Sequence, residues 1–335
     1  MIITARDKDV SLDLLDYYGY EYFNLGKNRK RILGKLAGLI HFNLRMFKLV
    51  WRYKPDLFIS HSSMYAAQVA WLTGSTSITL EDTGNLEQVR LYRPFTNIIL
   101  SPDCLTRSFG KKNLKYKGFH ELSYLHPNVF QKDASIKKEL GLVEMDKYII
   151  LRFVGHQASH DMGRQKLNME DKRKMVRELQ PYARIFISSE EVLPDDLKDF
   201  AFPLPAYRMA NALANADLYL GDSGTMASEA AVLGVPAIYI DHYGRDYTNY
   251  EEKKYGLVFN FIQDRFDVAE AINKAIYLLQ KEKVKEEWKE KQEKFLSEHI
   301  DVTNLLYHLI TRCPLKRSEL TARKIKELLP EFHLI

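Results

Sequence analysis

The sequence from residue 217 to residue 240, DLYLGDSGTMASEAAVLGVPAIYI, constrains the fold more than any other part of the chain. A short apolar run ends in a turn of small residues, a compact helix follows, and a second apolar run comes after Gly234 and Pro236. This order predicts two strands that lie parallel in one sheet and are joined by a helix. The fold class that it indicates is α/β, with helices covering parallel sheets.

The turn Ser223-Gly224-Thr225 stands at the start of the predicted helix. Unpaired backbone N–H groups and the positive end of the helix dipole are available there, which suits a phosphate group. Glu229 follows Thr225 by four residues and therefore lies on the same helix face. Its carboxylate could accept hydrogen bonds from sugar hydroxyls, so the stretch predicts a pocket for a nucleotide sugar.

Length and charge set the broad class of the protein. A chain of 335 residues fits two domains better than one. The net charge of +5 suits an anionic small molecule or an acidic membrane surface and demands neither. Two cysteines are too few for a disulfide framework, and the start of the chain carries no secretory signal. The longest uncharged run, residues 57–80, is too polar to span a membrane. The small number of cysteines favours a reducing compartment, so we expect a cytoplasmic protein.

Strands and helices alternate through the first third of the chain, which predicts a parallel sheet with helices on both faces. Ligands bind such sheets beyond the carboxyl ends of the strands. His61, Ser63, Glu81 and Asp82 fall at such ends and are candidates for a cleft, although Asp82 would serve equally well in a turn or cap. The chain starts directly with a strand, MIITAR, so a first βα unit is expected to be missing.

Two further groups of polar residues follow. His120 and Glu121 lie in KYKGFHELSYLHP, the expected passage between domains, where they either line a cleft or hold a hinge. Arg152 ends the strand YIILRF, and His156 and His160 follow in the next loop. A cationic and imidazole cluster facing a diphosphate is one interpretation, and loop capping is the other. No zinc-protease spacing or cysteine cluster is present, so we predict no metal.

Residues 29–53 form a basic amphipathic helix with apolar residues at helical spacing. Six of them form the apolar row: Leu33, Leu36, Ile40, Leu44, Phe47 and Trp51. One interpretation is a domain helix that packs on a sheet and exposes its charged face. The other is a contact with an anionic membrane surface. No nucleic-acid-binding motif appears, so nucleic acid is not expected as a partner.

Several of these stretches together resemble a prokaryotic family of unknown function that is related to UDP-N-acetylglucosamine 2-epimerases. The stretches are ITARDKDV, KYKGFHELSYLHP, LRFVGHQASHDMG, FISSEE, GDSGTMASEAAVLGVPAI and KKYGLVFNF. The resemblance implies the GT-B fold: two facing Rossmann-like domains and a last helix that crosses back to the first domain. The expected domains are residues 1–120 on the acceptor side, residues 121–298 for the nucleotide, and residues 299–335 returning to the first domain.

The resemblance also implies roles for individual residues. Ser223, Gly224 and Thr225 resemble the turn that holds the diphosphate in the epimerases, and Glu229 resembles the glutamate that holds the ribose. Arg152 and His156 fall near the phosphates. Ser63 stands where the epimerases have a catalytic aspartate, which argues against 2-epimerisation, because base and acid must stand on opposite faces of C2.

The function predicted from these observations is glycosyltransferase-like transfer from a UDP-type donor to an unknown acceptor, with no bound cofactor. Asp82, Glu81 and His120 are the candidates for the base, while His61, Ser63, Glu121 and His160 are expected to line the cleft. A sugar epimerase and a catalytically silent nucleotide-sugar-binding or membrane-peripheral protein remain as alternatives. Assembly as a homodimer is also left open.

Overall fold

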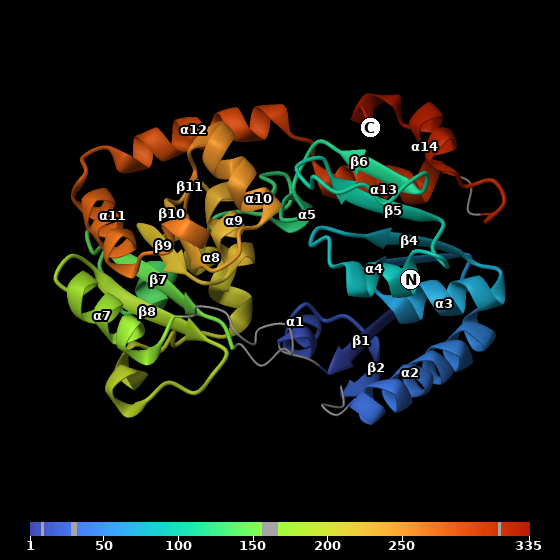
Figure 1. The fold of residues 1–335 in the computed structure, drawn as a ribbon, viewed down its shortest axis with the longest axis horizontal. Helices are drawn as coiled ribbons and strands as arrows, with labels where there is room; N and C mark the ends of the chain where they lie inside the picture. Colours follow the sequence, from blue (N-terminus) through green and yellow to red (C-terminus); the bar gives the residue numbers. More distant parts are fainter. Residues whose placement is uncertain (8–9, 28–31, 156–166, 314–315) are drawn as a thin grey trace. The chain divides into compact units, whose positions relative to one another are not determined.

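The computed structural model describes residues 1–7, 10–27, 32–155, 167–313 and 316–335. These residues form two compact units, which are coloured by sequence in Figure 1. The first unit contains Met1–His120 together with Ile300–Ile335, and the second contains Glu121–His299. The chain therefore leaves the first unit after His120 and returns to it for its last helices.

The strands of the first unit form two parallel sheets. The smaller sheet pairs β1 (Ile3–Asp7) with β2 (Tyr22–Lys27). The larger sheet has the order β3 (Leu57–His61), β4 (Thr76–Leu80), β5 (Ile98–Pro102) and β6 (Asn113–Tyr116). Every residue of β4 and β5 is buried, as expected for parallel strands that are covered on both faces.

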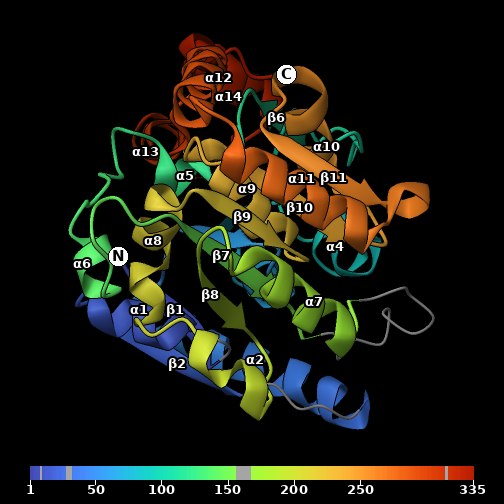
Figure 2. The same cartoon turned by 90° about the vertical axis from the view of Figure 1, so that its left-hand side faces the viewer.

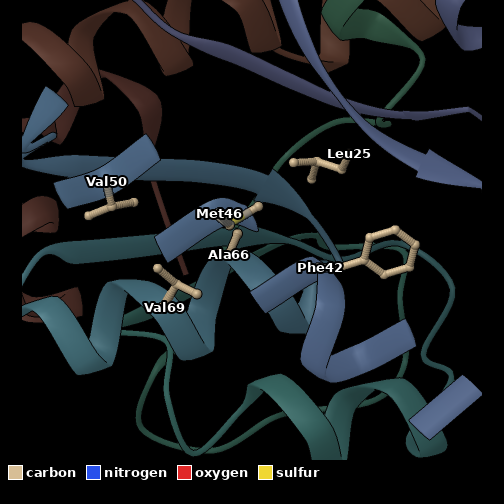
Figure 3. Packing of buried hydrophobic residues seen from close by; sticks show 6 residues of the cluster. All are labelled: Leu25, Phe42, Met46, Val50, Ala66 and Val69. Carbon is tan, nitrogen blue, oxygen red and sulfur yellow. The ribbon is translucent and has the colours of Figure 1, made fainter. Parts of the chain in front are cut away.

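In the described part of the first unit, six α-helices connect or flank these strands. They are α1 (Ser11–Tyr17), α2 (Ile32–Tyr53), α3 (Met64–Thr73), α4 (Leu86–Tyr92), α13 (Val302–Arg312) and α14 (Ala322–Leu328). Helices α2 and α3 share an apolar cluster with β2, shown in Figure 3, that consists of Leu25, Phe42, Met46, Val50, Ala66 and Val69. This cluster fixes which side of α2 faces the core.

The second unit is built on one parallel sheet of five strands. Their order is β11 (Val258–Ile262), β10 (Ala237–Asp241), β9 (Leu218–Gly221), β7 (Tyr148–Phe153) and β8 (Arg184–Ser189). Strand β7 pairs with both β8 and β9, so the chain reverses its direction across the sheet at this point. Ligands of open α/β sheets bind at such a switch point, beyond the carboxyl ends of the strands.

The helices of the second unit cover both faces of its sheet. The longer ones are α7 (Met169–Leu179), α8 (Met209–Asn215), α9 (Gly224–Val232), α11 (Val268–Gln280) and α12 (Val284–Glu298). The unit also contains the short α-helices α5 (Leu122–Leu125), α6 (Ile136–Glu139) and α10 (Asp246–Tyr250). Helices α7 and α11 pack together on one face, in front of the strands in Figure 2, while α8 and α9 pack on the other.

The predicted order of strand, turn, helix and strand in residues 217–240 is observed as β9, α9 and β10. Strand β10 pairs in parallel with β9. After α9, Gly234 adopts a φ of 73°, in the left-handed region that favours glycine.

Helix α2 differs from the sequence interpretation in the side that it buries. Phe42, Met46 and Val50 face the core, whereas Ile40 and Trp51 of the expected apolar row are 63% and 78% exposed. The helix carries apolar residues on two faces, and only one of them packs. Among the described residues, no helix is both long and apolar enough to cross a membrane.

Candidate functional site

The switch point of the second unit brings the ends of β7 and β9 together. Arg152 and Gly221 are partners in the register of the two strands. The Asp222 backbone N–H donates to the Arg152 carbonyl at 3.2 Å, and the Val154 N–H donates to Asp222 Oδ1 at 2.8 Å. Asp222 therefore ties the loop after β7 to the turn that begins α9.

The start of α9 offers backbone donors. Ser223 is the N-cap, and its hydroxyl accepts a hydrogen bond from the Met226 N–H at 3.3 Å. The N–H groups of Gly224 and Thr225 occupy the first two helical positions, which have no partner inside a helix. Within the described part of the chain, neither of them has a recorded protein acceptor. Two N–H groups and the helix dipole thus remain available for an anion.

A third chain segment approaches this turn closely. A Cβ atom on Gly224 would lie 2.8 Å from Arg245 Cγ and 3.0 Å from the Tyr247 hydroxyl, so only glycine fits there. Burial opposes the charge of Arg245, but Tyr239 and Tyr247 outweigh it and raise the pKa of its guanidinium. The stem of Arg245 therefore passes beside the start of α9, and its guanidinium keeps its positive charge.

Glu229 lies on the exposed side of α9 and is half-buried. Its Oε1 accepts a hydrogen bond from the Tyr124 hydroxyl at 2.8 Å. Burial raises the pKa of the Glu229 carboxyl, although Tyr124 and the charge of Arg152 oppose the shift. Tyr124 thus orients the Glu229 carboxylate one helical turn beyond the candidate phosphate-binding residues. A carboxylate in this position can accept hydrogen bonds from a pair of sugar hydroxyls.

Arg152 is held in place by the neighbouring strand. Its guanidinium donates to Ser188 Oγ at 2.8 Å and to Glu190 Oε1 at 2.6 Å. Glu190 also accepts the Gly155 N–H at 3.0 Å, so one carboxylate fixes both the arginine and the loop after β7. His156 and His160, which the sequence placed in this loop, lie outside the described residues.

The first unit contains a separate polar cluster at the carboxyl ends of β3 and β4. His61 Nε2 lies 3.0 Å from Asp82 Oδ1, and the rings of His61 and His120 are 4.7 Å apart between their centres. The His61 side chain is 42% exposed and the Asp82 side chain 19%, so the imidazole is partly exposed to solvent. A histidine oriented by a carboxylate is a common arrangement for a general base.

The three side chains set one another's charge. Burial lowers the pKa of His61, but the hydrogen bond to Asp82 and the charges of Asp82 and Glu81 more than offset it, so the pKa is raised. Burial and the positive charge of His61 lower the pKa of His120 to about 4. Burial raises the pKa of Asp82, yet its bond to His61 and both imidazole charges lower it overall. At neutral pH this predicts an ionised Asp82 and a neutral His120.

We expect histidine NMR titrations to resolve this pair. His61 should titrate above the ordinary value of about 6.5 and His120 near 4. In Asp82→Asn the partner charge is lost while burial remains, so the His61 midpoint should fall below about 6.5. The exposed Asp56→Asn variant is the control and should leave both midpoints unchanged. Equal midpoints for the two histidines in the parent protein would contradict the assignment.

The same pKa shift has a consequence for stability. Because the folded-state pKa of His61 is raised, its contribution to the free energy of unfolding is fully present below the unfolded value. It is lost as the pH rises through the folded-state pKa. Asp82, whose pKa is lowered, behaves in the opposite way: its contribution is present above its unfolded pKa and is lost as the pH falls through the folded value.

Glu81, predicted as a candidate base, is only 1% exposed and is surrounded by donors. Its Oε1 accepts the N–H and the hydroxyl of Thr83 and the Gly84 N–H, at 3.0, 2.9 and 2.8 Å. Its Oε2 accepts the Ser62 hydroxyl at 2.9 Å and also the Tyr92 hydroxyl. This geometry favours a role in holding the loops rather than in proton transfer.

Ser62 and Ser63 form the turn that directly follows His61 at the end of β3. Ser62 has a φ of 47°, which is unusual for a residue with a side chain, and its N–H and hydroxyl are both bonded to the β4 side of the sheet. Ser63 caps α3 by accepting the Ala66 N–H at 3.3 Å. Glu81 therefore stabilises the turn that orients His61, whereas Ser63 caps α3.

Glu121 is 4% exposed and belongs to the second unit, where its charge raises the pKa of the buried Glu251. The sequence left two roles open for Glu121, lining a cleft or holding a hinge, and its burial favours the structural one. No group of three or more His, Cys, Asp or Glu residues within the described ranges is arranged to hold a metal ion.

Two partners of the site were missed from the sequence. Glu190 follows the buried strand β8, and its place at a carboxyl strand end could have identified it. Tyr124 lies 105 residues before Glu229, and no local pattern signals that pairing. The structure also brings the Arg245 side chain to the start of α9.

Comparison with known proteins gives a family and a fold. The sequence model of a family described as "Protein of unknown function (DUF354)" matches residues 1–311. An uncharacterized protein from Methanocaldococcus jannaschii is 22% identical over 249 residues, which cover 71% of this chain and 72% of the relative.

Solved structures with similar folds include two epimerases and a glycosyltransferase. A putative UDP-N-acetylglucosamine 2-epimerase from Listeria monocytogenes has a TM-score of 0.65 at 15% identity, covering 92% of this chain and 86% of its own. The Neisseria meningitidis UDP-GlcNAc 2-epimerase bound to UDP-GlcNAc has a TM-score of 0.65 at 13% identity, covering 92% and 91%. The calicheamicin glycosyltransferase has a TM-score of 0.52 at 12% identity, covering 93% and 91%. These likenesses confirm the predicted GT-B class of α/β fold.

Proposed function

The chain belongs to the DUF354 family of unknown function, and from this premise we propose that it binds a UDP-type nucleotide sugar and transfers the glycosyl group to an acceptor. The second unit would hold the nucleotide. The N–H groups of Gly224 and Thr225 and the cation of Arg245 would contact the diphosphate, while Glu229 would accept hydrogen bonds from the ribose hydroxyls.

The position of Glu229 carries this proposal most directly. Its carboxylate, oriented by Tyr124, lies one helical turn beyond a capped helix start at the switch point of a parallel sheet. A nucleoside diphosphate presents its ribose diol and its phosphates together, so it matches an acceptor and a set of donors at this spacing. The similar epimerase from Neisseria meningitidis, which is bound to UDP-GlcNAc, supports the same ligand class.

Transfer requires that the acceptor hydroxyl lose a proton while the bond between the anomeric carbon and the diphosphate breaks. We propose that His61 is the base that accepts this proton. Asp82 would orient the imidazole and stabilise its charged form. The sequence favoured Asp82, Glu81 or His120 for this role. Asp82 and His120 have lowered pKa values and are weaker bases, and Glu81 already accepts hydrogen bonds from the loops.

A sugar epimerase is the second candidate. The two epimerases match the fold with higher TM-scores than the glycosyltransferase, 0.65 against 0.52. Ser63, in the position of the epimerases' catalytic aspartate, caps α3 and has no carboxylate to offer. Incubation with UDP-N-acetylglucosamine separates the two reactions: a C2 epimer supports the epimerase, whereas free UDP that rises with an added acceptor supports transfer.

Calorimetric titration with UDP tests the nucleotide site. Glu229→Ala should weaken UDP binding by about 1–3 kcal/mol, the scale of lost hydrogen bonds to a charged group. Glu286→Ala removes an exposed carboxylate in the first turn of α12 and is the matched control, with unchanged affinity expected. Flat heats for UDP, UDP-sugars and other nucleotides alike would refute the proposed ligand class, and a Glu229→Ala variant that binds normally would remove Glu229 from the site.

A further inference from the structure

Helix α2 carries no acidic residue between Ile32 and Tyr53, although it contains four lysines and arginines. A 22-residue helix on the outside of a domain ordinarily mixes both charges. Lys48 and Arg52 are exposed near its carboxyl end, and Lys54 follows directly after it. This end of the helix therefore exposes positive charge that no acidic residue of α2 neutralises.

The outer face of the same helix is apolar. Ile40, Leu44 and Trp51 are 63%, 58% and 78% exposed, and Phe47 lies between them on the same face. The core side of α2 is already complete, because Phe42, Met46 and Val50 pack there against β2 and α3 (Figure 3). The exposed row is thus a second apolar face, and its spacing of three and four residues makes it continuous along the helix.

A groove in the first unit continues this face. It has a volume of about 1060 Å³ and is lined by Trp51, the exposed Leu72 and the cations Lys54, Lys316 and Arg317, with Asp56 as its acidic member. Arg317 is held there by its bond to the Trp71 carbonyl at 3.1 Å, and its guanidinium lies 5.8 Å from the Trp71 ring centre. The groove thus joins apolar side chains to three cations, of which Arg317 is anchored in place.

The charges indicate what covers this surface. Two copies meeting through it would bring cations against cations and would bury lysines without partners. A bilayer with anionic headgroups offers negative charge above an apolar layer, which matches cations beside an exposed tryptophan. We propose that the outer face of α2 and the adjoining groove bind the surface of an anionic lipid bilayer, with headgroup phosphates between Lys54, Lys316 and Arg317.

Flotation with vesicles tests this surface. The protein should float with phosphatidylcholine vesicles that contain phosphatidylserine, remain behind with phosphatidylcholine alone, and dissociate at high salt. Lys48→Glu/Arg52→Glu should lower the vesicle partition coefficient at least about tenfold, because each basic residue near an anionic surface contributes to binding. Trp51→Ser should lower it as well, through lost insertion of an apolar side chain.

The controls change the same chemistry elsewhere in the first unit. Arg323→Glu/Lys324→Glu on α14 alters the net charge by the same amount, and Tyr307→Ser removes an aromatic side chain that is 61% exposed. Both should float like the parent protein. Because all the altered side chains are exposed, circular dichroism spectra should be unchanged.

Three outcomes would overturn the proposal. They are failure to float with anionic vesicles, equal flotation with neutral vesicles, and an equal loss in the α14 control. Sedimentation velocity adds a fourth: a dimer of the parent protein that Trp51→Ser converts to monomer would show that a second copy covers this face. None of these results depends on nucleotide binding, so they stand apart from the test of Glu229.

Discussion

Gly221→Ala should destabilise the second unit by at least about 3 kcal/mol, beyond the usual cost of an overpacked core. A Cβ atom at this position would lie 2.4 Å from the Arg152 carbonyl oxygen and 2.9 Å from both Arg152 Cβ and the Tyr219 hydroxyl. The nearest of these atoms belongs to the backbone of β7, so no rotation of a side chain relieves the contact. Strands β7 and β9 would have to separate at the point where the candidate nucleotide site begins.

Urea unfolding followed by fluorescence measures this effect in the appropriate unit. Trp288 is 1% exposed in the second unit, whereas Trp51 and Trp71, the other two tryptophans, are exposed in the first. The fluorescence change therefore reports chiefly on unfolding of the second unit. Restricting the readout to one unit matters because a protein with two compact units need not unfold in a single step.

Gly155→Ala is the matched control for this substitution. Gly155 lies in the loop after the same strand, and its added Cβ would meet Glu190 and Glu191 at ordinary distances of 3.4–3.5 Å. Its effect should stay within about 0.5 kcal/mol. If Gly221→Ala unfolds at the same urea concentration as the parent protein, the close approach of β7 and β9 is not as described.

The nucleotide half of the candidate site could be predicted largely from local sequence. Strand, turn, helix and strand are consecutive between residues 217 and 240, so their order alone places Ser223 and Gly224 at a helix start and Glu229 one turn later. What the local pattern could not supply are the contacts from distant segments. Tyr124 of α5 reaches Glu229, and Arg245 reaches Gly224, only because the fold brings separate segments of the chain to the end of the sheet.

The face that α2 buries could not be predicted for a different reason. Its apolar residues recur at helical spacing on two sides, so periodicity identifies a helix without selecting the packed face. The choice depends on partners that are far apart in the sequence, namely Leu25 of β2 and Ala66 and Val69 of α3. The residues of the expected apolar row that stay exposed are the ones that suggest a membrane surface.

The different roles of the adjacent carboxylates Glu81 and Asp82 could not be predicted from the sequence either. Strand β4 is buried on both faces, so the alternation that separates inside from outside is absent before them. Position alone made both of them candidates for catalysis. The structure separates them: Asp82 pairs with a partly exposed imidazole, and Glu81 points among five donors from Ser62, Thr83, Gly84 and Tyr92.

Glu81→Gln should therefore destabilise the first unit by about 3 kcal/mol, the upper range for lost hydrogen bonds to a buried charged group. The glutamine amide has one oxygen where the carboxylate has two. Its NH₂ group would therefore replace one of the carboxylate oxygens and would face the donors that are bonded to that oxygen in the parent protein. Thermal unfolding followed by circular dichroism measures the loss, read from the transition that shifts in Glu81→Gln and belongs to the first unit. Glu87→Gln changes an exposed carboxylate in the first turn of α4 and should shift the unfolding free energy by no more than about 0.5 kcal/mol.

A double-mutant cycle with Tyr92→Phe sharpens this prediction. The Tyr92 hydroxyl donates to Glu81, and burial and that carboxylate raise the pKa of the phenol. Removing the hydroxyl from the Glu81→Gln protein also removes one donor that would face the new amide. The double variant should thus lose less stability than the sum of the two single variants. If Glu81→Gln instead unfolds like the parent protein and loses only turnover, Glu81 takes part in the chemistry and the loop-holding role is wrong.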